Sequence, residues 1–250
     1  MLQLAIYGKG GIGKSTISCN LSAILTKKGL TVMQVGCDPK ADSTSLLHNG
    51  ERIPTVLQLT RERGKNIALG DAVCLSPSGV YCAEAGGPPA GLGCAGRGII
   101  NALETLEKLG AYDTYKPDIV IYDVLGDVVC GGFAMPMRKG YADKVIVVTS
   151  GERMSLYAGA NICMATENFK GRGYAQLGGI ILNRRNVPDE ERQVQNLADD
   201  FHTSILGAID RSNDFQEAEK LNQTLLEYAP ESVVYSQLNA IAEKLCGGLS

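Results

Sequence analysis

Short apolar runs alternate along the chain with longer stretches of helical spacing. The runs of strand character are residues 2–7, 31–35, 72–75, 119–122, 144–149, 177–183 and 204–209. The stretches with helical periodicity are residues 15–28, 55–59, 99–109, 155–169, 189–201 and 233–245. Because strands that alternate with helices pair in parallel, the pattern predicts an α/β fold, a mostly parallel sheet with helices on both faces, in a single domain over residues 1–250.

Residues 76–98 break this alternation. They are crowded with glycine and contain Pro77, Pro88 and Pro89, so we expect no regular secondary structure in them. Long glycine-rich loops inside a compact domain are usually functional. This interval is therefore a candidate functional segment.

The first predicted strand leads directly into a phosphate-binding loop. Residues 8–15 fit the pattern G-x-x-x-x-G-K-[ST], after a strand and before a helix, where this motif operates. Glycines let successive backbone N–H groups point inward, and the positive end of the helix dipole adds to their attraction for a triphosphate. Lys14 is expected against the β- and γ-phosphates, and the Ser15 hydroxyl on a Mg²⁺ ion. The nucleotide-binding residues predicted around this loop are Gly8, Lys9, Gly10, Gly11, Ile12, Gly13, Lys14, Ser15 and Thr16.

Lys9 is not required by the general motif. A second cation so close to Lys14 repels it unless phosphate lies between the two or the side chain reaches another subunit's nucleotide. Lys9 therefore points to a dimer. The alternative is a solvated loop lysine.

A second polar loop, residues 36–44, follows the strand at residues 31–35. It contains Asp38, Lys40 and Asp42 together with two hydroxyl side chains. In an open α/β sheet, ligands bind outside the carboxyl ends of the strands, so this loop is expected to face the nucleotide. A solvated polar turn is the alternative.

Asp123 ends the apolar strand at residues 119–122. An aspartate in that position, downstream of a phosphate loop, is where Mg²⁺ is expected. Asp127 follows within reach of the phosphates, and Cys130 stands three residues later. A shift of Asp127 on hydrolysis would move the sulfur, which couples the nucleotide state to whatever Cys130 binds.

The composition argues against several classes of function. The 250 residues carry a formal net charge of −3, so nothing argues for a nucleic-acid or membrane surface. No apolar run approaches the roughly 20 residues that cross a bilayer, and no leader-like segment precedes the first strand. We therefore expect a cytoplasmic protein, whose eight cysteines stay reduced and favour metal or redox chemistry over disulfides.

Two cysteines share a context suited to a metal cluster. Cys94 and Cys130 are glycine-flanked, and Cys94 stands just before a predicted helix, where a thiol is biased toward thiolate. Glycine-rich backbone near these cysteines would leave N–H groups available, and an anionic, thiolate-ligated cluster needs such hydrogen-bond donors around it. Two cysteines are half the ligand set of a 4Fe-4S cluster, which a symmetric dimer would complete. Cys82 is ambiguous, and the other cysteines are expected to serve packing.

Four segments together carry a resemblance to a known family: residues 9–16, 36–44, 93–98 and 122–133. The chain resembles the nitrogenase iron proteins (dinitrogenase reductases) and the nitrogenase-like reductases of chlorophyll and coenzyme F430 synthesis. The motifs run from the first strand to about residue 133, and a weaker similarity continues toward residue 218. The resemblance implies a P-loop NTPase fold of the deviant Walker A class.

The resemblance also implies a homodimer with one MgATP or MgADP site per subunit and one 4Fe-4S cluster held by Cys94 and Cys130 of both subunits. ATP hydrolysis would gate the transfer of one electron from the cluster to a nitrogenase or nitrogenase-like catalytic protein, and a low-potential donor, ferredoxin or flavodoxin, would reduce the cluster. The resemblance implies that Lys9 reaches the partner's nucleotide and that Lys40 touches phosphate across the interface. Asp38 and Asp127 would act on the attacking water, Asp123 and Ser15 would serve Mg²⁺, and Asp42 would belong to the nucleotide site. Asn183 and Gln216 would lie near adenine, and Arg97 would serve docking or regulatory ADP-ribosylation.

The sequence departs from the family pattern in two places. Nitrogenase iron proteins usually carry a C-terminal extension that wraps the partner subunit, whereas this sequence stops at Ser250, and residues 51–71 look shortened. A reductase of tetrapyrrole or coenzyme F430 synthesis is therefore an alternative to nitrogen fixation. A different class, a partition or division-site switch ATPase without a cluster, would explain Lys9 but not the glycine-flanked cysteines.

Overall fold

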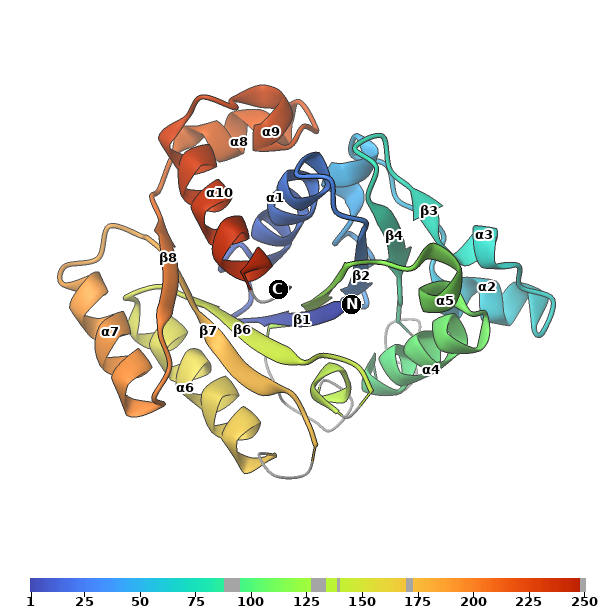
Figure 1. The fold of residues 1–250 in the computed structure, drawn as a ribbon, viewed down its shortest axis with the longest axis horizontal. Coiled ribbons are helices and arrows are strands. Elements are labelled where there is room, and N and C mark those ends of the chain that lie inside the picture. Colours follow the sequence, from blue (N-terminus) through green and yellow to red (C-terminus); the bar gives the residue numbers. More distant parts are fainter. Residues whose placement is uncertain (88–94, 127–133, 139, 170–172, 248–250) are drawn as a thin grey trace.

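The computed structural model describes residues 1–87, 95–126, 134–138, 140–169 and 173–247. Within these residues, one sheet of eight strands forms the centre of the molecule, in the order β3-β4-β2-β5-β1-β6-β7-β8 (Figure 1). The strands are β1 (Leu2–Tyr7), β2 (Val32–Cys37), β3 (Cys74–Leu75), β4 (Tyr81–Glu84), β5 (Ile119–Val124), β6 (Lys144–Thr149), β7 (Gln176–Asn183) and β8 (Ile205–Ile209). Neighbouring strands pair in parallel except β3 with β4, which confirms the predicted mostly parallel α/β fold.

Helices cover both faces of the sheet. One face carries α1 (Lys14–Lys27), α8 (Asn213–Lys220), α9 (Leu225–Tyr228) and α10 (Val233–Cys246). The other carries α2 (Val56–Arg63), α4 (Ala95–Lys108), α5 (Ala111–Tyr115), α6 (Arg153–Asn168) and α7 (Glu190–Asp200). The short elements η1 (Ser45–His48), α3 (Leu69–Ala72) and η2 (Met135–Met137) complete the described helices. Figure 1 shows α1 and α10 over the central strands and α6 and α4 on the opposite side.

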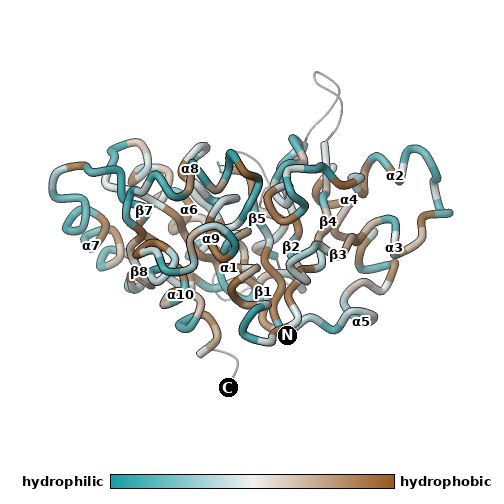
Figure 2. Tube along the Cα trace, turned by 90° about the horizontal axis from the view of Figure 1, so that it is seen from above, coloured by the Kyte–Doolittle hydropathy of each residue, from teal (hydrophilic) through white to brown (hydrophobic). Residues whose placement is uncertain are grey.

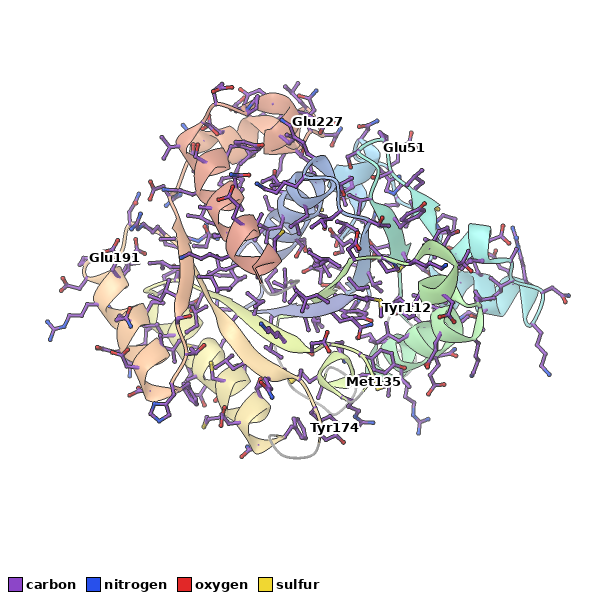
Figure 3. All side chains as sticks on the ribbon, in the orientation of Figure 1. Glu51, Tyr112, Met135, Tyr174, Glu191 and Glu227 are labelled. Carbon is purple, nitrogen blue, oxygen red and sulfur yellow. The ribbon has the colours of Figure 1, made fainter. Side chains whose placement is uncertain are left out.

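Alternation along the strands supplies both hydrophobic cores. In β1, Leu4 and Ile6 belong to the core beneath α1 and α10, whereas Ala5 and Tyr7 belong to the core beneath α4 and α6. All four side chains are buried, as the two-residue period of a strand requires when both faces are covered. Side chains fill the space between the sheet and both helical layers (Figure 3). Hydrophobic residues are concentrated in the central strands and hydrophilic residues at the outer loops (Figure 2).

The expectation that residues 76–98 lack regular structure is wrong. They contain β4, and α4 begins at Ala95 rather than at residue 99. A turn after β3, with Gly79 at φ 83°, reverses the chain so that Cys82 pairs with Cys74. The other edge of β4 pairs in parallel with β2, and these sheet contacts form the strand despite its glycine- and proline-rich flanks.

Several element boundaries also differ from the prediction. Residue 72, predicted to begin a strand, ends helix α3, and only Cys74–Leu75 pairs in the sheet. Helices α5, α8 and α9 were not anticipated, because eight residues or fewer give too few turns for a helical period to be recognised from the sequence. Of these three helices, α8 matters most for function, because it borders the site described below.

Three adjacent strands bring the polar loops together. β5 lies between β2 and β1 and pairs in parallel with both, so all three strands end at the same edge of the sheet. The phosphate loop follows β1, the loop at residues 38–44 follows β2, and Leu125 and Gly126 follow β5.

In the part of the chain that the structure describes, no helix combines the length and apolar character needed to span a membrane.

Candidate nucleotide-binding site

A cavity of about 530 Å³ lies at this edge of the sheet. Segments from all three loops and from α8 line it. The lining residues include Gly10, Gly11, Gly13, Lys14, Ser15, Thr16, Asp38, Lys40, Asp42, Ser43, Asp123, Gly126 and Glu219. The fold therefore brings most of the predicted nucleotide-binding residues to one hollow, although they come from positions far apart in the sequence.

The phosphate loop has the backbone conformation that its glycines permit. Gly11 and Gly13 have φ angles of 76° and 100°, a region that side chains other than glycine rarely adopt. Gly13 precedes α1, and no described side chain caps that helix end. Its first N–H groups are thus available to an anion, in the arrangement that binds phosphate. Lys14 is buried, and its Nζ donates to the carbonyl oxygen of Lys9 at 3.2 Å.

Asp123 is a buried carboxylate at the floor of the cavity. It is 2% exposed, and one of its oxygens, Oδ2, accepts a hydrogen bond from the Ser43 hydroxyl. Burial raises the pKa of Asp123, against the lowering effects of hydrogen bonds from Ser15 and Ser43 and of the charge of Lys14. Its Oδ1 has no hydrogen-bond partner within the described ranges. An orphaned carboxylate oxygen beside the Ser15 hydroxyl fits a hard cation such as Mg²⁺, which prefers oxygen ligands.

The loop at residues 38–44 is held in a local turn. The backbone N–H of Lys40 donates to Asp38 Oδ1 at 2.9 Å, and Ala41 has φ 52°. This side-chain-to-backbone bond is the Asx-turn for which aspartate is favoured. It leaves Asp38, Lys40 and Asp42 on the cavity wall.

Gly126 brings the segment after β5 against the phosphate loop. A Cβ at this position would lie 3.0 Å from both Gly10 Cα and the carbonyl oxygen of Gly8, and closer still to the Gly10 amide nitrogen. Only glycine permits so close an approach of two backbones. The phosphate loop and the segment that leads to Asp127 are therefore in direct contact.

A second cavity of about 230 Å³ adjoins the first at α8. Asn183 and Gln216, the two residues predicted near adenine, both line it, as does Glu219. Asn183 Nδ2 donates to the carbonyl oxygen of Ile12 at 2.6 Å, and Thr16 Oγ1 donates to Glu219 Oε1 at 2.9 Å. These bonds tie the end of β7 to the phosphate loop and α8 to the first turn of α1.

Other predicted residues lie away from these cavities or outside the described residues. Lys9 is half-buried, and Gly8 and Ile12 are buried within the loop, but none of the three lines either cavity. Arg97 is exposed in the first turn of α4. Asp127, Cys94 and Cys130 lie outside the described residues. Among the residues that are described, no group of three or more histidine, cysteine or acidic side chains could hold a metal ion.

Sequence reasoning missed two acidic residues of this region. Glu219 lies in the unpredicted α8, whose eight residues are too few for a helical period to be recognised from the sequence. Glu84 lies in β4, inside the segment expected to be irregular. The run Tyr81–Glu84, three residues of strand character followed by a carboxylate, resembles the pattern that identified Asp123 and could have found it.

Comparison with known proteins agrees with this geometry. A family model described as 4Fe-4S iron sulfur cluster binding proteins, NifH/frxC family, matches residues 2–248. The chain belongs to this family. The nitrogenase iron protein of Methanospirillum hungatei JF-1 is 55% identical over 248 residues, which cover 98% of this chain and 88% of that protein. The nitrogenase iron protein of Methanococcus voltae is 46% identical, with the same coverage of each chain.

Membership of the NifH/frxC family confirms the resemblance drawn from the sequence. It also confirms the class expected, an ATP-hydrolysing oxidoreductase of the nitrogenase reductase type. Among solved structures, the septum site-determining protein MinD of Pyrococcus horikoshii OT3, in complex with Mg-ADP, is similar with a TM-score of 0.75 and 22% identity, covering 100% of this chain and 99% of that one. At this identity the likeness shows the shared P-loop ATPase fold alone.

Proposed function

We propose that this protein hydrolyses MgATP to gate the transfer of one electron from a 4Fe-4S cluster, bridged between two subunits, to a nitrogenase or nitrogenase-like catalytic protein. The observation that carries the proposal is the cavity in which the phosphate loop faces Asp38, Lys40 and the orphaned oxygen of Asp123. The match to a family of 4Fe-4S cluster binding proteins over residues 2–248 supports the redox part.

The described residues have separate roles in this proposal. Lys14 and the N–H groups at the start of α1 hold the β- and γ-phosphates. Ser15 and Asp123 hold Mg²⁺, directly or through water, and Asp38 orients the attacking water. Asn183 and Gln216 contact adenine in the adjoining cavity. Asp42 helps to position the nucleotide from the cavity wall formed by residues 38–44, and Lys40, on the same wall, is proposed to touch phosphate across the subunit interface.

A second copy of the chain completes the site and the cluster. Lys9 is proposed to reach the partner's nucleotide, and Asp127 to act with Asp38 on the attacking water. Cys94 and Cys130 from both subunits are the proposed cluster ligands, and the cluster supplies a one-electron couple when bound. Cys94 immediately precedes α4, and a thiol at a helix N-terminus is biased toward the thiolate that ligates iron.

The remaining partners are an electron donor and an electron acceptor. A low-potential ferredoxin or flavodoxin is proposed to reduce the cluster, and Arg97, exposed on α4 three residues after Cys94, is proposed to contact the acceptor or to be modified by ADP-ribose. The acceptor is nitrogenase or, alternatively, a catalytic protein of tetrapyrrole or coenzyme F430 synthesis. Co-purification from native cells under anaerobic conditions would distinguish the two.

Iron content tests the proposal most directly. Protein purified without oxygen is expected to be brown and to contain about four irons per dimer. Cys94→Ser and Cys130→Ser should each abolish the iron while leaving MgADP binding in place. Cys246→Ser is the matched control, because that half-buried thiol lies at the end of α10 and should leave the iron unchanged.

Iron-free protein after anaerobic reconstitution would contradict the redox proposal. If such protein bound DNA or lipid vesicles in an ATP-dependent manner, the switch ATPase would be the better interpretation. Unchanged iron in both serine variants would show that other thiols hold the cluster.

A further inference from the structure

Glu84, the last residue of β4, is a buried carboxylate that contacts the loop at residues 38–44, here called the nucleotide loop. Its side chain accepts two hydrogen bonds at Oε1, from the backbone N–H and from the hydroxyl of Thr44, both at 2.7 Å. The residue is 1% exposed, and its Oε2 has no partner in the described part of the chain. Thr44 therefore supplies the hydrogen bonds that stabilise this carboxylate.

Gly36 makes room for the carboxylate. A Cβ at position 36 would overlap Glu84 Oε2 and would lie 2.6 Å from Glu84 Cδ and 2.7 Å from Ser43 Cβ. The carbonyl oxygen of Gly36 accepts from the N–H of Ala85 at 2.8 Å, which fixes the end of β4 beside β2. The carboxylate is thus enclosed between β2 and the nucleotide loop.

The buried Glu84 carboxyl group links the nucleotide loop to β4. Burial raises the pKa of Glu84 to about 7, although the hydrogen bonds from Thr44 lower it and the nearby Asp123 and Asp42 raise it further. A buried carboxyl group that loses its hydrogen-bond donors keeps the whole cost of desolvation. Thr44 therefore cannot move away from β4 at small cost, and the loop and the strand end are expected to move together.

The chain after Glu84 extends this connection to α4. A Cβ at Gly87 would lie 2.5 Å from Pro39 Cβ, so Gly87 packs directly on the nucleotide loop. A Cβ at Gly98 would lie 3.4 Å from the carbonyl oxygen of Gly86 and 3.8 Å from Gly87 Cα. Gly86 and Gly87 thus lie between Pro39 and the first turn of α4, the helix that begins one residue after Cys94.

We propose that Glu84 is a positioning residue that couples the nucleotide loop to the amino end of α4, so that nucleotide occupancy changes the surroundings of Cys94. This inference rests on the proposed function, in which Cys94 ligates the cluster. The route is separate from the one through Asp127 and Cys130, because it leaves the nucleotide site by β2 and β4 rather than by β5. Contacts between packed backbones and one buried hydrogen-bonded pair form its physical links.

The test measures how the cluster responds to nucleotide binding, and it does not depend on catalytic turnover. In anaerobically purified dimer, the rate at which an Fe(II) chelator removes iron is measured with and without saturating MgATP, and the ratio of the two rates is the readout. Glu84→Ala removes the carboxylate that holds Thr44 to β4, so the ratio is expected to fall from its wild-type value toward one. The response that remains is the part carried by the separate route through Asp127 and Cys130. Glu84→Gln keeps an acceptor for Thr44 and should retain most of the wild-type ratio.

Two further variants separate coupling from stability. Val80→Ala truncates a fully buried side chain just before β4, at the end of the strand opposite Glu84, and leaves the Glu84–Thr44 hydrogen bonds in place. It should therefore lower the melting temperature and keep the wild-type ratio. Thr44→Val removes the hydroxyl bond but keeps the N–H bond, and it should give an intermediate ratio even if Glu84→Ala fails to fold.

The possible outcomes distinguish a failure of this inference from a failure of the proposed function on which it rests. A wild-type ratio in Glu84→Ala, or in Thr44→Val when Glu84→Ala is unfolded, overturns the positioning role and leaves the proposed function intact. An equal loss in Val80→Ala also overturns it, because general destabilisation would then explain the effect. Wild-type protein without iron, or without any response to MgATP, overturns the proposed function itself.

Discussion

Gly126→Ala should uncouple the nucleotide site from the segment after β5. The added Cβ would lie 3.0 Å from Gly10 Cα and from the carbonyl oxygen of Gly8, where ordinary contacts are 3.4–4 Å, and still closer to the Gly10 amide nitrogen. All three neighbours are backbone atoms and cannot rotate away. Either the phosphate loop or the end of β5 must therefore move by about 0.5–1 Å, beyond the tolerance of about 0.5 Å for a catalytic arrangement.

Two magnitudes follow from that displacement. Overpacking of this kind costs about 1–3 kcal/mol in the free energy of unfolding. A misplacement of about 1 Å among reacting groups costs roughly 100-fold in rate, so MgATP hydrolysis should fall much further than stability does. Urea unfolding and the release of inorganic phosphate, measured on the same anaerobic preparation, provide the two numbers.

Gly70→Ala is the matched control for Gly126→Ala. A Cβ at Gly70 would have no neighbour within 4 Å, and the position lies inside helix α3. Replacing a helical glycine with alanine stabilises by about 0.5–1 kcal/mol, and hydrolysis should be unchanged. Wild-type hydrolysis in Gly126→Ala would refute the reasoning, because the close backbone approach would then not be needed for the reaction.

Three further predictions concern the charged groups. Lys14→Gln removes a charge-assisted contact worth about 1.5–3 kcal/mol, so calorimetry should show MgATP binding about 10- to 150-fold more weakly; unchanged affinity would contradict the assigned role. Asp123→Asn should abolish Mg²⁺-dependent hydrolysis without lowering the stability of the nucleotide-free protein at pH 7, because burial already raises the pKa of this carboxyl and an amide avoids the cost of ionisation. Glu84 has a pKa of about 7 in the folded protein, above its ordinary 4.5, so the unfolded chain ionises first as pH rises. The unfolding free energy of the nucleotide-free protein should then fall by about 3 kcal/mol between pH 4.5 and 7 relative to Glu84→Gln, and parallel pH profiles of the two proteins would count against it.

Local sequence was sufficient for much of the fold. β1 and the start of α1 were predicted within one residue, because an apolar run, a glycine-rich turn and a helical period are all properties of neighbouring residues. The loops after β1, β2 and β5 could be assigned to one edge of the sheet for the same reason, since parallel strands share the direction of their carboxyl ends. β4 was missed because its run is only four residues long between glycine- and proline-rich flanks, and its pairing with β2 and β3 is what makes it a strand.

By itself, the sequence determined the phosphate loop, the carboxylates that follow β2 and β5, and the family to which the chain belongs. Their chemistry depends on residue type and on short spacing, which folding does not alter. Only the tertiary structure decided that Asn183 contacts Ile12 across 171 positions, that Glu219 contacts Thr16 across 203, and that Glu84 is enclosed with Thr44. Those contacts depend on strand order and helix packing. Strand order and helix packing are in turn decided by burial over the whole chain rather than by any one segment.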